Sequence, residues 1–395
     1  MRDGWKEISL EDLEIQKVIK LGRGDVISKK DMEADPGPNP VYSSAENKNG
    51  MIGKYAKYMF DEELITWSVD GGGHIFYRPK HKFSVTNIGG WLRILDSKVF
   101  SYQFLTYALQ RLHKQHHFDW QHKAHPSVIR KLYTRIPLPP LPEQKRIVDL
   151  ISSVDSYIEA LQQQLETAKR SRNAVLHELL TAGGDDWVET TLGEICTEGL
   201  FADGDWVESK DQDPEGEYRL LQLADIGDGT FLNKSDRWMN REQFNRLGCT
   251  KLEVNDVLIA RMPDPIGRAC LFPERLPVCA TVVDVAIVRT GNETLQKFLV
   301  LLINSSDFRT EAFSLLTGTT RQRISRGNLA KISFAIPSQE KQLEIVNLIS
   351  LFDGEIAQSV RVIDEAKQLR SGLLSDLLSG EHEIPVTYDK VMGAA

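Results

Sequence analysis

The residues of this sequence best suited to chemistry are basic and amide side chains in a few short stretches. Lys and Arg neutralise phosphates, while Arg and Gln can pair with guanine and adenine edges in the major groove of DNA. We therefore expect nucleic-acid contacts, and Arg321, Gln322 and Arg323 are the best base-reading candidates. The full set of candidates is Arg78, Lys80, Lys82, Lys114, Gln121, Lys123, Arg261, Arg268, Arg321, Gln322, Arg323 and Arg326.

The distribution of charge supports this hypothesis better than the total does. The chain has 395 residues and a net charge of −8, which is not typical of a simple nucleic-acid binder. Residues 64–135, however, hold eleven Lys or Arg against three acids, and residues 319–331 hold four more with no acid. Two basic segments thus interrupt an acidic chain.

Other chemistries lack their motifs. Seven of the nine histidines fall between His74 and His125, but no Cys or paired carboxylate accompanies them, which disfavours a metal site. The four cysteines have no Cys-x-x-Cys spacing and are expected to be buried free thiols. The sequence has neither a phosphate-binding loop nor an Asn-Pro-Pro-aromatic methylase motif. Pro263-Asp264 and Glu365-Ala-Lys367 lie too far apart to be a nuclease motif, so no catalytic residue is predicted.

The elements that must position these side chains occur twice. Residues 147–182 match residues 345–380 without a gap, with thirteen of 36 positions identical. Asp3-Gly-Trp-Lys-Glu-Ile-Ser-Leu10 likewise matches Asp185-Asp-Trp-Val-Glu-Thr-Thr-Leu192. The offsets are 198 and 182, so the second copy has about 16 extra residues, which we assign to a loop at residues 198–217.

Each copy ends in a long helix with an alternating four-three spacing of seam positions, which is typical of a coiled coil. We expect the two helices to pair in antiparallel orientation and to form a spacer about 50 Å long. Arg172 and Arg370 are expected to snorkel or to pair with acids that fix the register, with partner binding as the alternative. The seam comprises Ile147, Ile151, Ile158, Leu165, Arg172, Leu179, Ile345, Ile349, Ile356, Ile363, Arg370 and Leu377.

Both globular parts have the pattern of mixed β structure. Expected strands cover residues 64–69, 74–77 and 85–94 in the first copy, with a turn at Gly71-Gly-Gly73, and residues 257–260, 268–272 and 281–288 in the second. A helix is expected around Phe104 and another around Phe298. The fold class is α+β, a pseudo-two-fold repeat of two recognition domains and two helices. The predicted boundaries are 1–136 for domain 1, 137–184 for helix 1 and a linker, 185–336 for domain 2, 337–380 for helix 2 and 381–395 for a tail.

The chain resembles the specificity subunits of type I restriction–modification systems. The residues that carry the resemblance are the duplication, Ile136-Pro-Leu-Pro-Pro-Leu-Pro-Glu-Gln144, Arg219-Leu-Leu-Gln-Leu-Ala-Asp-Ile-Gly-Asp-Gly-Thr-Phe231 and Asp256-Val-Leu-Ile-Ala-Arg-Met-Pro-Asp-Pro-Ile-Gly-Arg268. The first half has no equivalent of Arg-Met-Pro-Asp-Pro. The resemblance implies that each domain reads one half of a split site in double-stranded DNA. It also implies two methyltransferase subunits and, in the full complex, restriction subunits. S-adenosylmethionine, ATP and Mg²⁺ would bind those partners and not this chain.

Two other classes of function remain as alternatives. A coiled-coil adaptor without DNA binding would explain the seams but not the basic segments, and it predicts assembly that is insensitive to salt. A free-standing methylase or nuclease is disfavoured by the missing motifs. The longest apolar run, Phe298 to Ile303, is too short to span a bilayer, and the N-terminal residues lack a signal-peptide core. A cytoplasmic location without membrane contact is therefore expected.

Overall fold

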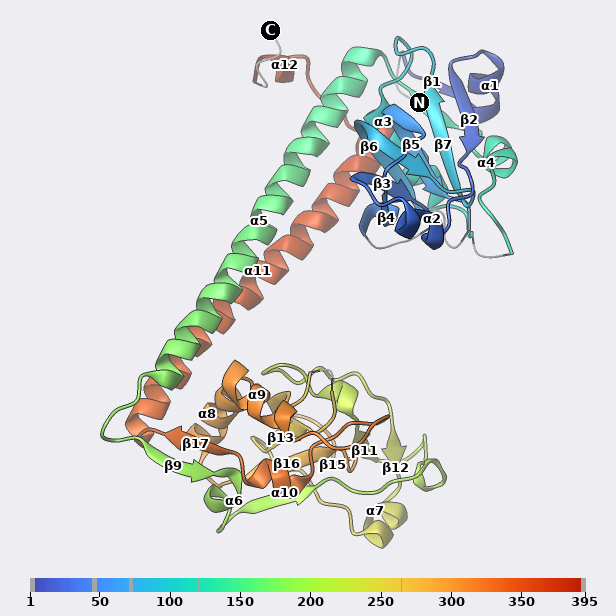
Figure 1. Ribbon diagram of the computed structural model, residues 1–395. Helices are drawn as coiled ribbons and strands as arrows, with labels where there is room; N and C mark the ends of the chain where they lie inside the picture. The colour runs from blue at the N-terminus through green and yellow to red at the C-terminus, as the bar shows by residue number, and fades with distance from the viewer. Residues whose placement is uncertain (1–3, 45–47, 71–73, 119–120, 264, 392–395) are drawn as a thin grey trace. The chain divides into compact units, whose positions relative to one another are not determined.

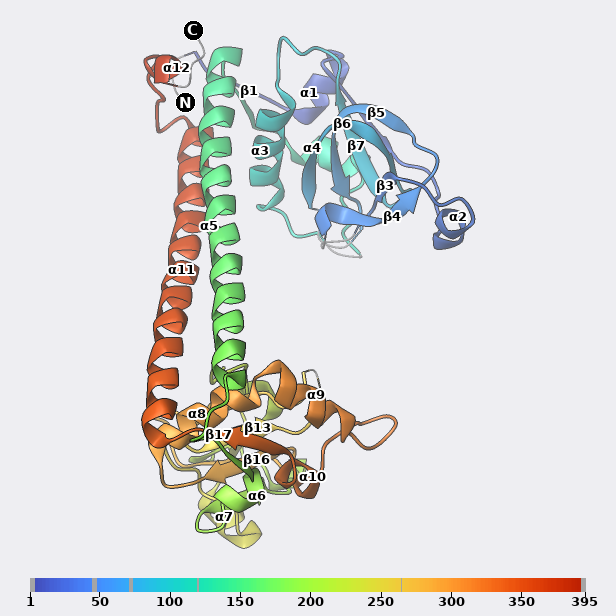
Figure 2. The same cartoon turned by 60° about the vertical axis from the view of Figure 1, so that its left-hand side comes forward.

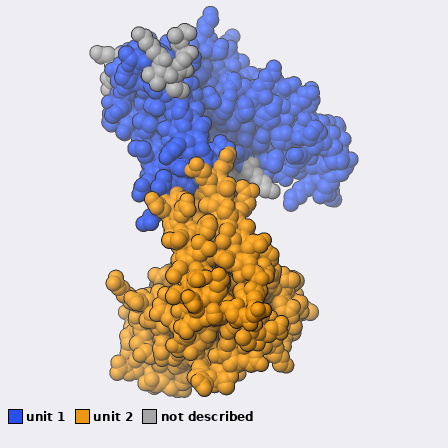
Figure 3. Space-filling view, turned by 90° about the vertical axis from the view of Figure 1, so that its left-hand side faces the viewer, with its two compact units in different colours: residues 1–162, 361–395 blue, residues 163–360 orange. Residues whose placement is uncertain are grey.

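The computed structural model describes residues 4–44, 48–70, 74–118, 121–263 and 265–391. The chain divides into two compact units, residues 1–162 with 361–395 and residues 163–360, which Figure 3 distinguishes by colour. Each unit contains one globular domain and a segment of each of two long helices, α5 and α11 (Figure 1). The α+β class and the two-fold repeat predicted from the sequence are confirmed.

The first domain is built on a six-stranded sheet in the order β2-β7-β5-β6-β3-β4, in which only the β3–β6 pair is parallel. Helix α3 lies between this sheet and α5, where Phe104, Leu105 and Ala108 share one core with Ile65, Leu92 and Ile151 (Figure 2). The elements are β2 Ile19–Arg23, α2 Lys29–Ala34, β3 Asn39–Tyr42, β4 Met51–Tyr55, β5 Phe60–Ser68, β6 Ile75–Val85, β7 Gly89–Ile94, α3 Tyr102–His113 and α4 Pro126–Leu132.

The second domain has a four-stranded sheet, β10-β16-β13-β14, and a three-stranded sheet, β12-β11-β15. Its helix α8 repeats the burial pattern of α3, because Phe298, Leu299 and Leu302 lie in the core as Phe104, Leu105 and Ala108 do. The elements are β10 Leu200–Asp203, β11 Tyr218–Leu221, β12 Trp238–Met239, α7 Arg241–Leu247, β13 Val257–Ala260, β14 Ala269–Leu271, β15 Cys279–Thr281, β16 Val285–Arg289, α8 Glu293–Ile303, α9 Ser306–Ser314 and α10 Arg326–Ala330.

The two domains share one topology. In the first domain the long strand β6 pairs with β5 on one side and with β3 on the other. In the second domain two short strands take the place of β6, because β14 pairs with β13 and β15 pairs with β11. Each domain also closes in the same way, because its first strand pairs with the strand just before its long helix. These pairs are β1 Lys6–Ile8 with β8 Ile136–Leu138, and β9 Val188–Thr191 with β17 Ser333–Ile336. Helices α1 Leu10–Ile15 and α6 Leu192–Ile195 follow the first strands.

Two sequence-based assignments were wrong in detail. The strands expected at 85–94 and 281–288 are each broken by a turn, in which the N–H of Gly89 donates to Thr86 O at 2.8 Å and that of Val285 to Val282 O at 2.9 Å. Residues 198–217 are not an inserted loop, because β10 lies there and pairs with β16. The extra length lies instead between β11 and β13, in residues 222–237 and 240–256. The expected turn at residues 71–73 lies outside the described residues.

Helices α5 (Leu141–Thr181) and α11 (Gln339–Ser379) have matching bounds at an offset of 198. A buried glutamine fixes the start of each. Gln144 Nε2 donates to Val99 O at 2.8 Å and to Pro139 O at 3.0 Å, and Gln342 Nε2 donates to Pro337 O at 2.9 Å. The Pro-Leu-Pro-Glu-Gln sequence is thus the joint between a domain and its helix.

Within each unit the two helix segments run antiparallel. In the first unit Ile147 and Ile151 share a core with Leu377, and in the second Leu176 shares one with Ile345 and Ile349. The described seam positions are buried or half-buried. These are Ile147, Ile151, Ile158, Leu165, Arg172, Leu179, Ile345, Ile349, Ile356, Ile363, Arg370 and Leu377.

The two seam arginines form matching ion pairs. Arg370 contacts Asp155 at 2.7 and 2.8 Å in the first unit, and Arg172 contacts Asp353 at 2.8 and 3.1 Å in the second. Both are bidentate, a geometry that adds directional specificity. After α11 the chain packs Ile384 into the first core, and Arg146 contacts Asp389 of α12 (Tyr388–Val391) at 3.2 Å. Among the described residues, no helix combines the length and apolarity needed to cross a bilayer.

All four cysteines are buried free thiols, as expected. Burial raises the pKa of the Cys249 and Cys270 thiols to about 12, so the reactive thiolate is scarce near neutral pH.

We expect the folded protein at pH 8 to react with iodoacetamide at least ten times more slowly than the protein unfolded in guanidinium. Mass spectrometry of timed samples measures this, and rapid labelling of the native chain would contradict the burial.

Candidate nucleic-acid interface

Two connecting segments occupy equivalent places in the two domains, one inside the basic stretch 64–135 and one that overlaps the basic stretch 319–331. Residues 114–125 connect α3 to α4, and residues 315–325 connect α9 to α10. Each is followed by a short helix and then by the strand that closes the domain, β8 or β17. Segments of different sequence therefore return to the same frame at the same point, although the second one follows an additional helix, α9.

Each segment is also anchored from the same sheet position. The N–H of Ala124 donates to the carbonyl of Val69, just after β5, at 2.9 Å, and the N–H of Ile324 donates to the carbonyl of Arg261, just after β13, at 3.0 Å. Side chains add to this anchor, because Trp67 Nε1 donates to Ala124 O at 2.8 Å and Arg261 Nη1 donates to Ile324 O at 3.3 Å. The side chains of Ala124 and Ile324 are buried. The end of a central strand thus fixes the end of the variable segment in both domains.

In the second domain the segment forms a projecting hairpin. The N–H of Thr317 donates to Arg323 O and that of Arg323 donates to Thr317 O, both at 3.0 Å. Gly318 has φ +96°, a left-handed conformation that favours glycine. Arg321 and Gln322 lie exposed between the paired residues, a suitable position for reaching base edges.

Two candidates are corrected by their burial. Arg78 and Arg261 are each 4% exposed. Arg78 donates to Thr66 Oγ1 at 2.8 Å and to Asn49 O at 2.7 Å, and its guanidinium stacks 3.6 Å from the Tyr42 ring centroid. Burial lowers the pKa of Arg78 to about 10. These two arginines support their domains from inside and do not offer their charge to DNA.

The other candidates remain at the surface or near it. Lys80, Lys82, Lys114, Gln121 and Lys123 are exposed in the first domain. Lys82 Nζ lies 4.8 Å from the Tyr58 ring centroid, and Lys123 contacts Asp70 at 3.2 Å. In the second domain Arg268 is half-buried and donates from Nε to Ile226 O at 3.1 Å.

Carboxylates beside the hairpin were not anticipated from the sequence. Arg323 contacts Asp284 at 3.6 Å, while Asp203 lies 3.3 Å from Arg261 and 3.9 Å from Arg326. Arg326 also donates to Phe201 O at 3.3 Å. These acids orient the arginines and neutralise part of their charge, so Arg321 is the candidate whose charge is best placed for an outside partner.

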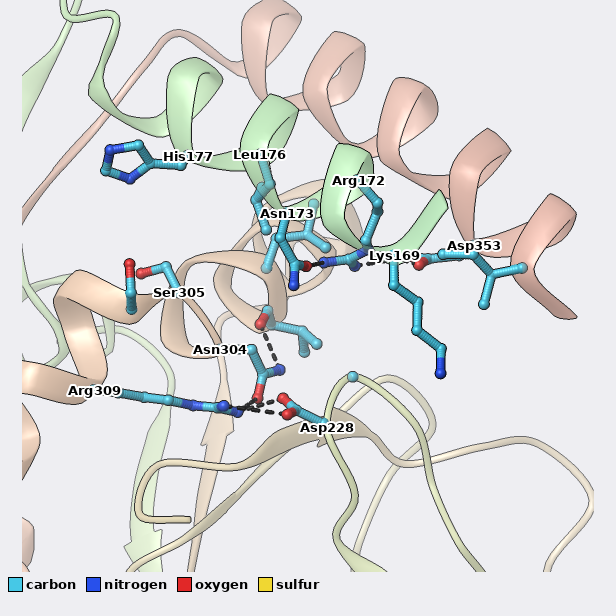
Figure 4. Close-up of a pocket in the computed structure, with 15 residues that line it drawn as sticks. Lys169, Arg172, Asn173, Leu176, His177, Asp228, Asn304, Ser305, Arg309 and Asp353 are labelled. Atoms are coloured by element: carbon cyan, nitrogen blue, oxygen red, sulfur yellow. Dashed lines mark hydrogen bonds and ion pairs between the residues drawn. The ribbon is translucent and has the colours of Figure 1, made fainter. Parts of the chain in front are cut away.

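The second unit also has a pocket of about 660 Å³ where α5 faces α8 and α9 (Figure 4). Its arginines are already paired, Arg172 with Asp353 and Arg309 with Asp228 at 3.1 Å. In the first unit, the ring of Tyr107 on α3 lies 5.5 Å from the guanidinium of Arg370, the counterpart of Arg172. When α3 and α8 are aligned by their buried residues, Leu301 takes the position of Tyr107 in the second unit. Leucine is smaller than tyrosine, so space remains beside α5 in the second unit. Because Arg172 and Arg309 are already paired with carboxylates, this space is a poor binding site for an anion.

Within the described part of the chain, no group of three or more His, Cys, Asp or Glu side chains is arranged to hold a metal ion. His113 instead bonds the Tyr133 hydroxyl and stacks 4.5 Å from Phe118, centroid to centroid. His125 caps α4, where burial and the charges of Arg23 and Arg130 lower its pKa. These histidines belong to the domain structure.

The chain is thus a two-domain protein with two long paired helices, and each domain has a basic segment at an equivalent place. The sequence matches the family of the type I restriction modification DNA specificity domain over residues 3–170 and 184–368. The chain belongs to this family.

The MjaVIII specificity subunit of Methanocaldococcus jannaschii is 22% identical over 413 aligned positions, covering 96% of this chain and 93% of that protein. The MpnII specificity subunit of Mycoplasma pneumoniae is 29% identical over 170 residues, 41% of this chain and 50% of that protein. The chain thus spans about half the length of this relative.

Solved structures agree on the fold. An S subunit of a type I restriction–modification system from M. genitalium has a TM-score of 0.51 at 16% identity, covering 94% of this chain and 96% of that one. A chain from a study of complex assembly in the type I system has a TM-score of 0.60 at 17% identity, covering 96% and 98%.

Proposed function

We propose that this chain reads a bipartite site in double-stranded DNA, with one globular domain for each half of the site. The observation that carries the proposal is the equivalence of residues 114–125 and 315–325, which are different basic sequences anchored by the same main-chain hydrogen bond, to Val69 O and to Arg261 O, in a repeated frame. A shared frame with divergent exposed segments suits two readers of different base sequences. The adaptor alternative gives no reason for either segment to be basic.

In this proposal, recognition separates into two kinds of contact. Exposed lysines such as Lys80, Lys82 and Lys114 contact phosphates, which position each domain without reading sequence. Arg321 and Gln322 reach base edges, where a bidentate contact distinguishes guanine or adenine. Helices α5 and α11 fix the gap between the two halves of the site.

The chemistry is assigned to partner proteins in the cytoplasm. Two methyltransferase subunits dock on the helices, bind S-adenosylmethionine and take the target adenine out of the duplex. Restriction subunits that use ATP and Mg²⁺ join in the full complex. This chain holds none of these cofactors and supplies the choice of site.

Mapping N6-methyladenine across the genome, with and without this gene and alongside its methyltransferase, tests the proposal. We expect one split motif, two short words at a fixed separation, to lose its methylation when the gene is removed. An unchanged methylation map would overturn the proposal. Assembly with partner proteins that is insensitive to salt and independent of DNA would then favour the adaptor.

A further inference from the structure

A short Gly-Asp sequence recurs in the two domains, beside each candidate interface. Gly24-Asp25-Val26 and Gly204-Asp205-Trp206 follow β2 and β10. A Cβ on Gly24 would lie 1.9 Å from Val85 O, and one on Gly204 would lie 2.2 Å from Val282 O, so both positions require glycine. Asp25 and Asp205 then form parallel bridges to Thr86 and Val282. The backbone is therefore held against the neighbouring strand at the same point in both domains.

The next residue in each copy is apolar and exposed. Val26 is 77% exposed and Trp206 is 67% exposed. A single exposed apolar side chain needs no explanation. Exposure at the same position of two diverged domains, directly after a close approach that fixes the backbone, indicates a shared use of this position.

Trp206 borders a cleft of about 650 Å³. Its lining includes Gln212, Gln222 and Asp284, and Asp284 contacts Arg323 at 3.6 Å. Asp203, three residues before Trp206, lies 3.9 Å from Arg326. In the first domain Arg23 lies three residues before Val26, as Asp203 lies before Trp206, and burial together with the charge of Arg23 lowers the pKa of His125 at the end of the basic segment.

The polar side chains that line the cleft suit base edges and not phosphate groups. Asp205, Glu208 and Asp284 give it carboxylates, which repel phosphates but can accept hydrogen bonds from the cytosine amino group. Gln212 and Gln222 offer the donor and acceptor pair that matches adenine. The indole ring supplies an apolar face that can contact the thymine methyl group at a base edge.

We propose that Trp206, and Val26 in the first domain, are specificity-determining contacts with DNA bases, and that the Trp206 cleft receives base edges. The inference rests on the proposed function and adds residues outside the basic segments to the reading surface. In this proposal the hairpin approaches the duplex beside the cleft, so Arg321 and Trp206 read neighbouring bases.

Selection from a random library of DNA duplexes tests this with the full-length chain and its W206A, W206F and V26A variants. The matched control is V254A, which removes an exposed apolar side chain elsewhere in the second domain. We expect W206A to lose at least tenfold discrimination at one or two positions of the second word, W206F to keep most of it and V26A to relax only the first word. V254A should select the wild-type sequence.

Selection of both wild-type words by W206A and V26A would overturn the inference and leave the proposed function standing. If the wild-type chain selects no sequence, the proposed function fails and the inference falls with it. Circular dichroism of each variant shows that it is folded. Relaxation of the second word by W206F as well as W206A, with both folded, still supports a contact that depends on the full indole ring.

Discussion

Replacing Arg321 and Arg323 together with Ala should strongly weaken discrimination in the second half of the DNA site and leave the first half intact. A bidentate contact to a base contributes roughly 1–3 kcal/mol, which is on the order of 10- to 100-fold for each lost pair. The effect stays local because the hairpin backbone is closed by main-chain hydrogen bonds between Thr317 and Arg323, which the substitution keeps. Methylation mapping in cells that carry the variant gene measures the change.

The matched control for this variant is R241A. Arg241 is an exposed arginine of the same domain, on α7, and its side chain lies 3.8 Å from Glu217. We expect R241A to keep both words. Loss of both words in the hairpin variant would contradict the modular function of the two domains, and so would loss of the first word alone.

Replacing Arg261 with Met should destabilise the second domain by about 3 kcal/mol, in the range seen when one partner of a buried ion pair is removed. The substitution leaves Ile324 O and Val283 O without their side-chain donor and leaves the carboxylate of Asp203 with one arginine instead of two. It also removes the side-chain donor to Ile324 O at the base of the hairpin, while the main-chain bond from Ile324 N–H to Arg261 O remains. Base discrimination should therefore fall in part without the loss of any base-reading side chain. Urea unfolding, compared with wild type, measures the free energy of unfolding.

The R321M variant is the control for stability, because Arg321 is exposed at the hairpin tip and surface substitutions usually change stability by no more than about 0.5 kcal/mol. R78M is the counterpart in the first domain, since Arg78 is buried to the same extent. An R261M protein as stable as wild type would show that the buried guanidinium does not support the hairpin.

The helices and the repeat could be predicted from the sequence because their signal is local. The seam spacing that begins at Ile147 recurs at Ile345, and the helices that it predicts have the same bounds at an offset of 198. The strand breaks were missed because Thr86-Asn-Ile88 and Val282-Val-Asp284 contain residues with strong β propensity. A single turn hydrogen bond in each, from Gly89 and from Val285, overrides that preference.

The basic segments could also be found from the sequence, since a local excess of charge is visible without a structure. The orientation of each arginine was not predictable. Arg78 and Arg261 are buried because they contact Asn49 and Ile324, which lie 29 and 63 positions away in the chain. The repeat at Gly24-Asp25 and Gly204-Asp205 was visible in the sequence, but the assignment of residues 198–217 to a loop concealed it.

The two matching ion pairs also bear on how such a gene can change. Each helix has an aspartate in its first half and an arginine in its second half, Asp155 and Arg172 in α5 and Asp353 and Arg370 in α11. A genetic crossover between the two copies within these helices replaces aspartate with aspartate and arginine with arginine at these four positions. The recombined helix keeps both charges in register, so the two ion pairs between the helices are retained when recognition domains are exchanged, even though only thirteen of 36 helix positions are identical.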